Sequence, residues 1–93
     1  MHYLYILLLK NNQLYTGVTN NLRRRYQEHL DGKVTSTKLR RPIRLIHYEA
    51  YLLKEDAIRR ERYLKTNEGR KFLRRQISTL LQKLNLYKRF ARG

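Results

Sequence analysis

The chain has 93 residues and carries 22 Lys and Arg against 7 Asp and Glu, a formal net charge of +15. It contains no Cys, which excludes a disulfide framework, zinc–thiolate sites and thiol catalysis. The length suits one compact domain, and the longest apolar run, residues 3–9, is far too short to span a bilayer.

The large positive charge indicates a polyanionic partner. Lys and Arg gain free energy when they displace condensed counterions from phosphates, so nucleic acid is the first candidate. An anionic membrane surface is the second candidate partner. The alternative to any such partner is that the charged residues are solvated and only keep the chain soluble. Arginine dominates the basic runs, which lie at residues 23–25, 40–41, 59–60 and 74–75.

The first third of the chain predicts a hairpin followed by a helix. Residues 2–9 are typical of a buried strand and residues 13–17 of its partner, with Asn11 and Asn12 between them. A helix should follow and end at Leu30. Its N-cap candidates are Asn20 and Asn21, and its stop signal is Asp31 with Gly32.

The remainder predicts a loop, a strand and two helices. Residues 33–44 form a basic loop, residues 43–52 a third strand, and helices should cover residues 54–67 and 68–85. The last helix carries an apolar stripe made of Phe72, Leu73, Ile77, Leu80, Leu81 and Leu84. The order ββαβαα predicts an α+β fold, with a small three-stranded antiparallel sheet flanked by helices in a domain over residues 1–85. Residues 86–93 form a short basic tail.

Two helical positions stand out chemically. Arg25 and His29 lie four residues apart and share a helix face, an arrangement that suits a phosphate, although both could simply be solvated. Glu61 falls on the apolar side of its predicted helix, whereas Arg59, Arg60 and Arg62 fall outside it. A carboxylate that faces a core needs a positive partner, which is either an internal Arg or a divalent metal.

Taken together, these residues resemble the GIY-YIG nuclease family, and most closely its small stand-alone bacterial members, which are related to the nuclease domain of an excision-repair incision enzyme. The resemblance covers residues 3–72. It rests on Tyr3-Leu4-Tyr5, Tyr15-Thr16-Gly17, Asn21 to Arg25 with His29, Thr37 to Pro42, Glu49-Ala50 and Glu61 to Lys65. Tyr3 stands where the family motif has Gly, and Thr16 where it has Ile.

The resemblance implies a metal-dependent DNA endonuclease that hydrolyses phosphodiester bonds, is structure-selective and serves DNA repair or recombination. The catalytic residues it implies are Tyr5, Tyr15, Arg25, His29 and Glu61. Glu61 would be the metal ligand for Mg²⁺ or Mn²⁺, because Mg²⁺ tolerates few protein ligands when waters and substrate phosphates complete its shell. Tyr15 would take the proton of the attacking water, and Arg25 would hold the phosphate oxygens.

Binding to DNA would come from six basic residues, Arg23, Arg24, Lys33, Lys38, Arg40 and Arg41. RNA is a weaker candidate partner, which Tyr87, Lys88, Arg89 and Phe90 of the tail would engage by stacking. The resemblance further implies a cytoplasmic bacterial protein at the nucleoid, no membrane contact, and room for a protein partner that directs it to its substrate. The alternative function is a non-catalytic nucleic-acid-binding module on the same scaffold.

One geometric consequence follows for the hairpin. Tyr5 and Tyr15 can share a site only if they face the same side of the sheet, and a two-residue loop at Asn11 and Asn12 would put them on opposite faces. We therefore expect a three-residue turn over Lys10, Asn11 and Asn12, or a bulge, with Asn12 in the left-handed conformation.

Overall fold

A computed structural model describes residues 1–84 of the chain. Its elements are β1 (His2–Leu8), β2 (Leu14–Thr19), α1 (Leu22–Leu30), η1 (Lys38–Arg40), β3 (Arg44–Tyr51), α2 (Lys54–Leu64) and α3 (Asn67–Gln76). The predicted order ββαβαα is confirmed, with the short 3-10 turn η1 inside the predicted loop. Two compact units make up the chain: the first spans Met1–Arg62 and the second begins at Tyr63. The prediction of one domain over residues 1–85 stays a prediction.

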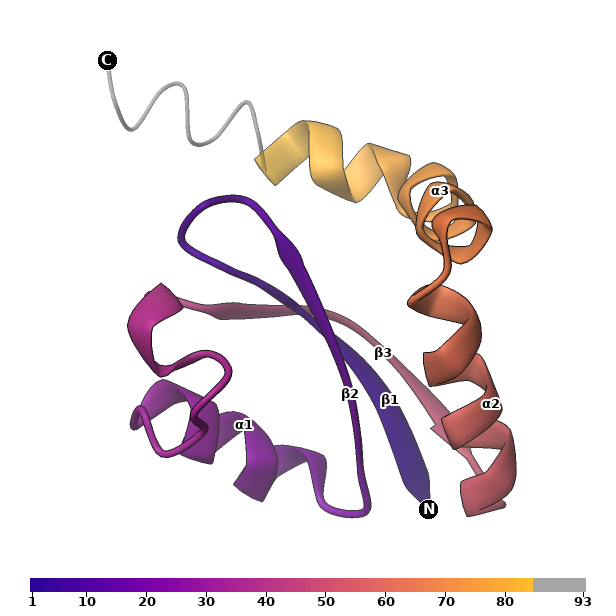
Figure 1. Ribbon diagram of the computed structural model, residues 1–93, viewed down its shortest axis with the longest axis horizontal. Helices are drawn as coiled ribbons and strands as arrows, with labels where there is room; N and C mark the ends of the chain where they lie inside the picture. The colour runs from indigo at the N-terminus through magenta and orange to yellow at the C-terminus, as the bar shows by residue number, and fades with distance from the viewer. Residues whose placement is uncertain (85–93) are drawn as a thin grey trace. The chain divides into compact units, whose positions relative to one another are not determined.

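The three strands form the predicted antiparallel sheet, and their order in it is β2-β1-β3, so β1 lies at its centre. Side chains of β1 alternate between the two faces. Tyr5, Leu7 and Leu9 form a core with Ile43, against which Leu22 and Tyr26 of α1 pack. Leu4 and Ile6 are fully buried on the other face. Figure 1 shows α1 on one face of the sheet and α2 on the opposite face.

The turn between β1 and β2 has three residues, as the sequence predicts. The Leu9 N–H donates to the Gln13 carbonyl at 2.9 Å, which leaves Lys10, Asn11 and Asn12 as the loop. Asn12 has a φ of 67°, the left-handed value expected of it. In the resulting register Leu7 pairs with Tyr15 and Tyr5 with Gly17, so Tyr5 and Tyr15 face the same side.

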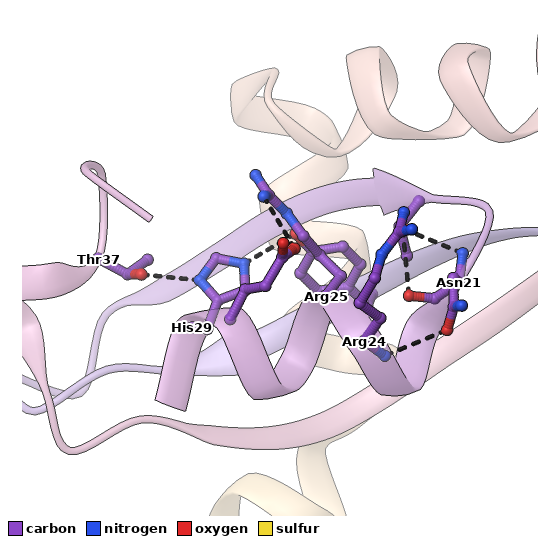
Figure 2. A network of polar contacts seen from close by, with 8 residues as sticks. Asn21, Arg24, Arg25, His29 and Thr37 are labelled. Atoms are coloured by element: carbon purple, nitrogen blue, oxygen red, sulfur yellow. Dashed lines mark hydrogen bonds and ion pairs between the residues drawn. The ribbon is translucent and has the colours of Figure 1, made fainter. Parts of the chain in front are cut away.

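Helix α1 begins and ends at its predicted signals. The Asn21 side chain accepts a hydrogen bond from the Arg24 N–H at 3.1 Å, which satisfies one free donor of the first turn (Figure 2). At the other end Asp31 is the C-cap, and Gly32 follows with a φ of 73°. The left-handed φ is the reason why glycine is favoured in this turn, where the Arg41 guanidinium lies close to the glycine.

Helix α2 is tied to β3 by an ion-pair cluster that the sequence pattern does not predict. Arg60 makes a two-pronged contact with Glu49, at 3.0 Å from Nε to Oε1 and 3.3 Å from Nη2 to Oε2. Glu49 also contacts His47 at 3.0 Å and accepts from the Tyr51 hydroxyl at 2.7 Å. Although Arg60 falls outside the apolar stripe of its helix, its side chain is only 20% exposed, because it faces a carboxylate.

The second unit departs from the predicted continuous helix over residues 68–85. Helix α3 ends at its C-cap Ile77, where φ is −108° and ψ is 27°, and residues 78–84 form a separate helical stretch. Ile77 is β-branched, which weakens its preference for helix, yet it is buried and keeps the apolar spacing across the break. Phe72 is 49% exposed and contacts the Tyr63 ring, so its placement in the buried stripe is wrong.

The expected tail at residues 86–93, with Tyr87, Lys88, Arg89 and Phe90, lies outside the described residues, as does the predicted helix end at Asn85. Within residues 1–84 no helix combines the length and the apolar character that crossing a bilayer requires.

We expect Arg60→Met to lower the free energy of unfolding by about 2 kcal/mol, because it leaves the half-buried Glu49 carboxylate without its guanidinium partner. The matched control is Arg59→Met on the same helix. Arg59 is 75% exposed and pairs with Asp56 in solvent, so this change should cost less than about 0.5 kcal/mol. Urea unfolding measures both variants, and equal losses would contradict the assigned role of Arg60.

Candidate active site

The Tyr5 ring packs directly over the backbone of Gly17. It lies on β1 opposite Gly17 of β2, and a Cβ at position 17 would collide with the Tyr5 hydroxyl and ring. The bare backbone of Gly17 therefore gives the Tyr5 ring the space it occupies beside the edge strand. The Tyr5 side chain is almost completely buried, at 2% exposure.

His29 holds the Tyr5 hydroxyl from the other side. Its Nε2 lies 2.9 Å from the Tyr5 hydroxyl, and its Nδ1 lies 2.7 Å from Thr37 Oγ1. Figure 2 shows His29 on α1 between Thr37 and the sheet, with Arg25 on the same side of the helix. His29 and Thr37 are both fully buried. The alternative of a solvated His29 is therefore wrong, and a phosphate has no access to its ring.

Tyr15 completes an aromatic cluster around His29. The Tyr15 and His29 ring centres lie 5.3 Å apart and the two rings meet edge-on, as the Tyr5 and His29 rings do at 5.6 Å. The two tyrosine rings lie 6.4 Å apart. Unlike Tyr5, Tyr15 is partly exposed. The structure thus brings both motif tyrosines and His29 together, with Tyr15 as the member that solvent can reach.

The Tyr5 hydroxyl lies within the electrostatic reach of the other predicted residues. Burial raises the pKa of Tyr5, whereas a hydrogen bond and the positive charge from Arg25 act to lower it. The negative charge of an ionised Tyr15 and that of Glu61 raise the pKa of Tyr5 further. With the hydrogen bond to His29, one buried hydroxyl therefore interacts with all four other candidate residues.

Arg25 is the cation of the site and remains accessible. Its hydrogen bond to Tyr5 raises the pKa of the guanidinium, which burial would lower. It also pairs with Glu28 one turn away at 3.4 Å, and both side chains are 37% exposed. An exposed pair of this kind contributes little to stability. A phosphate can therefore compete with Glu28 for Arg25 at small cost.

Glu61 lies on α2 and is partly exposed. Within residues 1–84 no group of three or more His, Asp or Glu side chains comes together, so these residues form no complete metal cage. The negative charge of Glu61 raises the pKa of Tyr5 and is the smallest of the influences on it named above. A single partly exposed carboxylate fits Mg²⁺, which keeps several waters and takes substrate oxygens as ligands.

The six predicted DNA-binding residues are all exposed. They occupy the first turn of α1, the loop after it and the turn η1. Arg41 is held in place, since its guanidinium donates to the backbone carbonyls of Lys38 at 3.1 Å and Leu30 at 3.3 Å. Three arginines in the first turn of α1, with no acidic residue there, oppose the helix dipole and leave that end suited to an anion.

Thr37 is the site residue that sequence reasoning missed. It lies in the basic loop between residues 33 and 44, where its neighbours predict only the absence of a helix. A hydroxyl that becomes fully buried against a histidine eight residues earlier leaves no trace in hydropathy or spacing. Its one signal is its membership of the run Thr37 to Pro42, on which part of the family resemblance rests.

We expect the His29 ring to be mostly neutral at pH 6.5. Burial, together with the positive charge of Arg25, lowers the pKa of His29 below its ordinary 6.5, although Glu28 acts in the opposite direction. Because the folded-state pKa is lowered, the stability linked to this group is present above pH 6.5 and is lost as the pH falls below it. Ring-nitrogen NMR measures the titration directly, and a midpoint at or above 6.5 would refute the expectation.

Comparison with known proteins agrees with this geometry. A sequence model of the GIY-YIG catalytic domain matches residues 1–75. The UPF0213 protein SH2523 of Staphylococcus haemolyticus is 46% identical over 66 residues, which cover 70% of this chain and 80% of that protein. The UPF0213 protein YazA of Bacillus subtilis is 42% identical over 65 residues, which cover 69% of this chain and 66% of YazA.

The fold is also similar to a solved structure. The solution NMR structure of the UPF0213 protein BH0048 from Bacillus halodurans superimposes with a TM-score of 0.51 at 37% sequence identity. The match covers 77% of this chain and 80% of that one. The paired tyrosines over a three-stranded sheet, the sequence match and the shared fold lead to one conclusion: the chain belongs to the GIY-YIG nuclease family.

Proposed function

We propose that this chain is a metal-dependent DNA endonuclease that hydrolyses phosphodiester bonds. The observation that supports this most strongly is the surrounding of the Tyr5 hydroxyl. A hydrogen bond to His29 and electrostatic interactions with Tyr15, Arg25 and Glu61 converge on that one atom. The five side chains come from two strands and two helices, and Tyr15, Arg25 and Glu61 are partly exposed and so open to a substrate.

Each of the three accessible residues, Arg25, Tyr15 and Glu61, has a separate role in the proposed reaction. Arg25 binds the non-bridging oxygens of the scissile phosphate and stabilises the negative charge that grows there in the transition state. Tyr15, as its phenolate, accepts the proton of the attacking water and becomes the neutral phenol. Glu61 would hold Mg²⁺ or Mn²⁺, and a bound divalent cation supplies further positive charge to the phosphate and the leaving oxygen.

The buried residues keep this arrangement fixed. Tyr5 presents its hydroxyl to Arg25, and His29 holds Tyr5 while its own orientation is set by Thr37. His29 and Thr37 are therefore positioning residues in this proposal. The Glu49–Arg60 contact has a similar effect at longer range, since it fixes α2 at the position next to Glu61.

Binding of the DNA backbone is assigned to the exposed cations around the site. Arg23 and Arg24 in the first turn of α1 carry charges that the helix dipole disfavours, and phosphates would relieve this repulsion. Contacts to phosphates position the strand and carry no sequence information. We therefore propose selection by DNA structure, which fits a role in repair or recombination, with RNA as a weaker substrate.

The test is cleavage of single-stranded, duplex, flap and branched DNA, with an RNA strand alongside, in Mg²⁺ or Mn²⁺. We expect Glu61→Ala to abolish cutting while binding persists, and Tyr15→Phe to slow it by about a hundredfold or more. The matched control is Glu55→Ala, since Glu55 is an exposed carboxylate in the first turn of the same helix. Cutting that survives in Glu61→Ala would contradict the proposal, as would a wild-type protein that binds but never cuts.

A further inference from the structure

A second feature lies on the neighbouring flank of α1, away from Arg25 and His29. A half-open hollow of about 590 Å³ separates α1 from β3, a size typical of small-molecule sites. The residues that give it its character are Tyr3, Arg23, Tyr26, Leu30, Leu45 and Tyr48. Since α1 turns by about 100° per residue, Arg23, Tyr26 and Leu30 line up on this flank.

Aromatic rings form much of its wall. Tyr3 and Tyr48 are diagonal neighbours on β1 and β3, and their rings meet edge-on with centres 6.3 Å apart. Tyr48 is 57% exposed, so its ring is open to a ligand in the hollow. Exposed tyrosine rings in a hollow are the surfaces on which unpaired nucleobases stack.

The charge of the hollow favours the same ligand. Arg23 lies at its wall, and among residues 1–84 no Asp or Glu lines it. Asn20 and Gln27 contribute amide groups of the kind that pair with base edges. A smaller hollow of about 370 Å³ shares Leu30 with it and is lined by Arg41. We call the larger hollow, with Arg23 and Tyr48 in its lining, the trough.

We propose that this trough binds an unpaired nucleobase of the substrate DNA, stacked on Tyr48 with its phosphate on Arg23. A base inside a duplex is already stacked between its neighbours and cannot enter. The trough would therefore select strands with a single-stranded segment next to the site of cleavage. This inference rests on the proposed function for the identity of the strand, and it requires no catalysis.

The test uses Glu61→Ala protein, so that the DNA stays intact, and fluorescence anisotropy with two labelled strands: an oligothymidine and an abasic strand of equal length and charge. We expect Tyr48→Ala in this background to weaken binding of the oligothymidine about tenfold and to leave the abasic strand unchanged. Tyr48→Phe is the matched control and should retain affinity, because the ring remains. Arg23→Gln should weaken binding of both strands.

Equal losses for the two strands, or no loss for either, would overturn the proposal, as would tighter binding of an RNA strand or of an extended peptide at this site. A second measurement does not depend on the folding of any Tyr48 variant. Photocrosslinking of a 5-iodouracil strand to the Glu61→Ala protein should label Tyr48 or Tyr3, and labelling confined to other residues would contradict the trough.

The two proposals fail separately. A chain that shows the Tyr48-dependent binding but cuts no DNA would refute the nuclease and leave the base site standing. A chain that cuts DNA in a Glu61-dependent manner, with no base-dependent loss in Tyr48→Ala, would refute the base site alone.

Discussion

The arrangement depends on one close approach, that of the Tyr5 ring to the backbone of Gly17. Any side chain at position 17 would fill the space of the Tyr5 hydroxyl, and the hydroxyl could then not reach His29. The approach in turn requires that Tyr5 face Gly17 across the hairpin, which the three-residue turn with its left-handed Asn12 provides. The positions of the turn, Gly17, Tyr5 and His29 therefore depend on one another. Thr37 connects the basic loop to this group, because its hydroxyl contacts His29, which in turn contacts the Tyr5 hydroxyl. The loop that carries Lys38 and Arg40 is held in place by these contacts.

The arginines at the start of α1 lower the stability of this helix, and the proposed function assigns them to binding phosphates. Arg23, Arg24 and Arg25 stand at the positive end of the helix dipole, where acidic residues would each stabilise by about 0.3–1 kcal/mol. The helix holds instead through its Asn21 cap and through Leu22 and Tyr26, which pack on the sheet core. Arg25 and His29 lie on one side of the helix, and Arg23, Tyr26 and Leu30 line the trough on another, with Tyr26 also packing on the sheet core. A helix of nine residues separates the proposed site of cleavage from the proposed base site.

Local rules account for much of the fold and for the grouping of the tyrosines. Strand alternation gave the common face of Tyr5 and Tyr15, and cap chemistry gave the ends of α1. Two of the missed features depend on contacts between separate elements of the chain. Thr37 meets His29 inside a loop without periodicity, and Arg60 meets Glu49 although its helical position faces away from the apolar stripe. The break at Ile77 escapes detection because its buried side chain keeps the apolar spacing of a continuous helix.

The proposed function requires that Glu61 and the tyrosine cluster face one shared space in which a divalent metal can bind. Paramagnetic broadening by substoichiometric Mn²⁺, followed in amide NMR spectra of the whole chain, tests this without any substrate. We expect signals around Glu61, Tyr15 and Arg25 to broaden first, and Glu61→Ala to remove the effect. Broadening centred on another carboxylate, such as Asp56 or Glu49, or broadening that Glu61→Ala leaves unchanged, would refute a shared metal site.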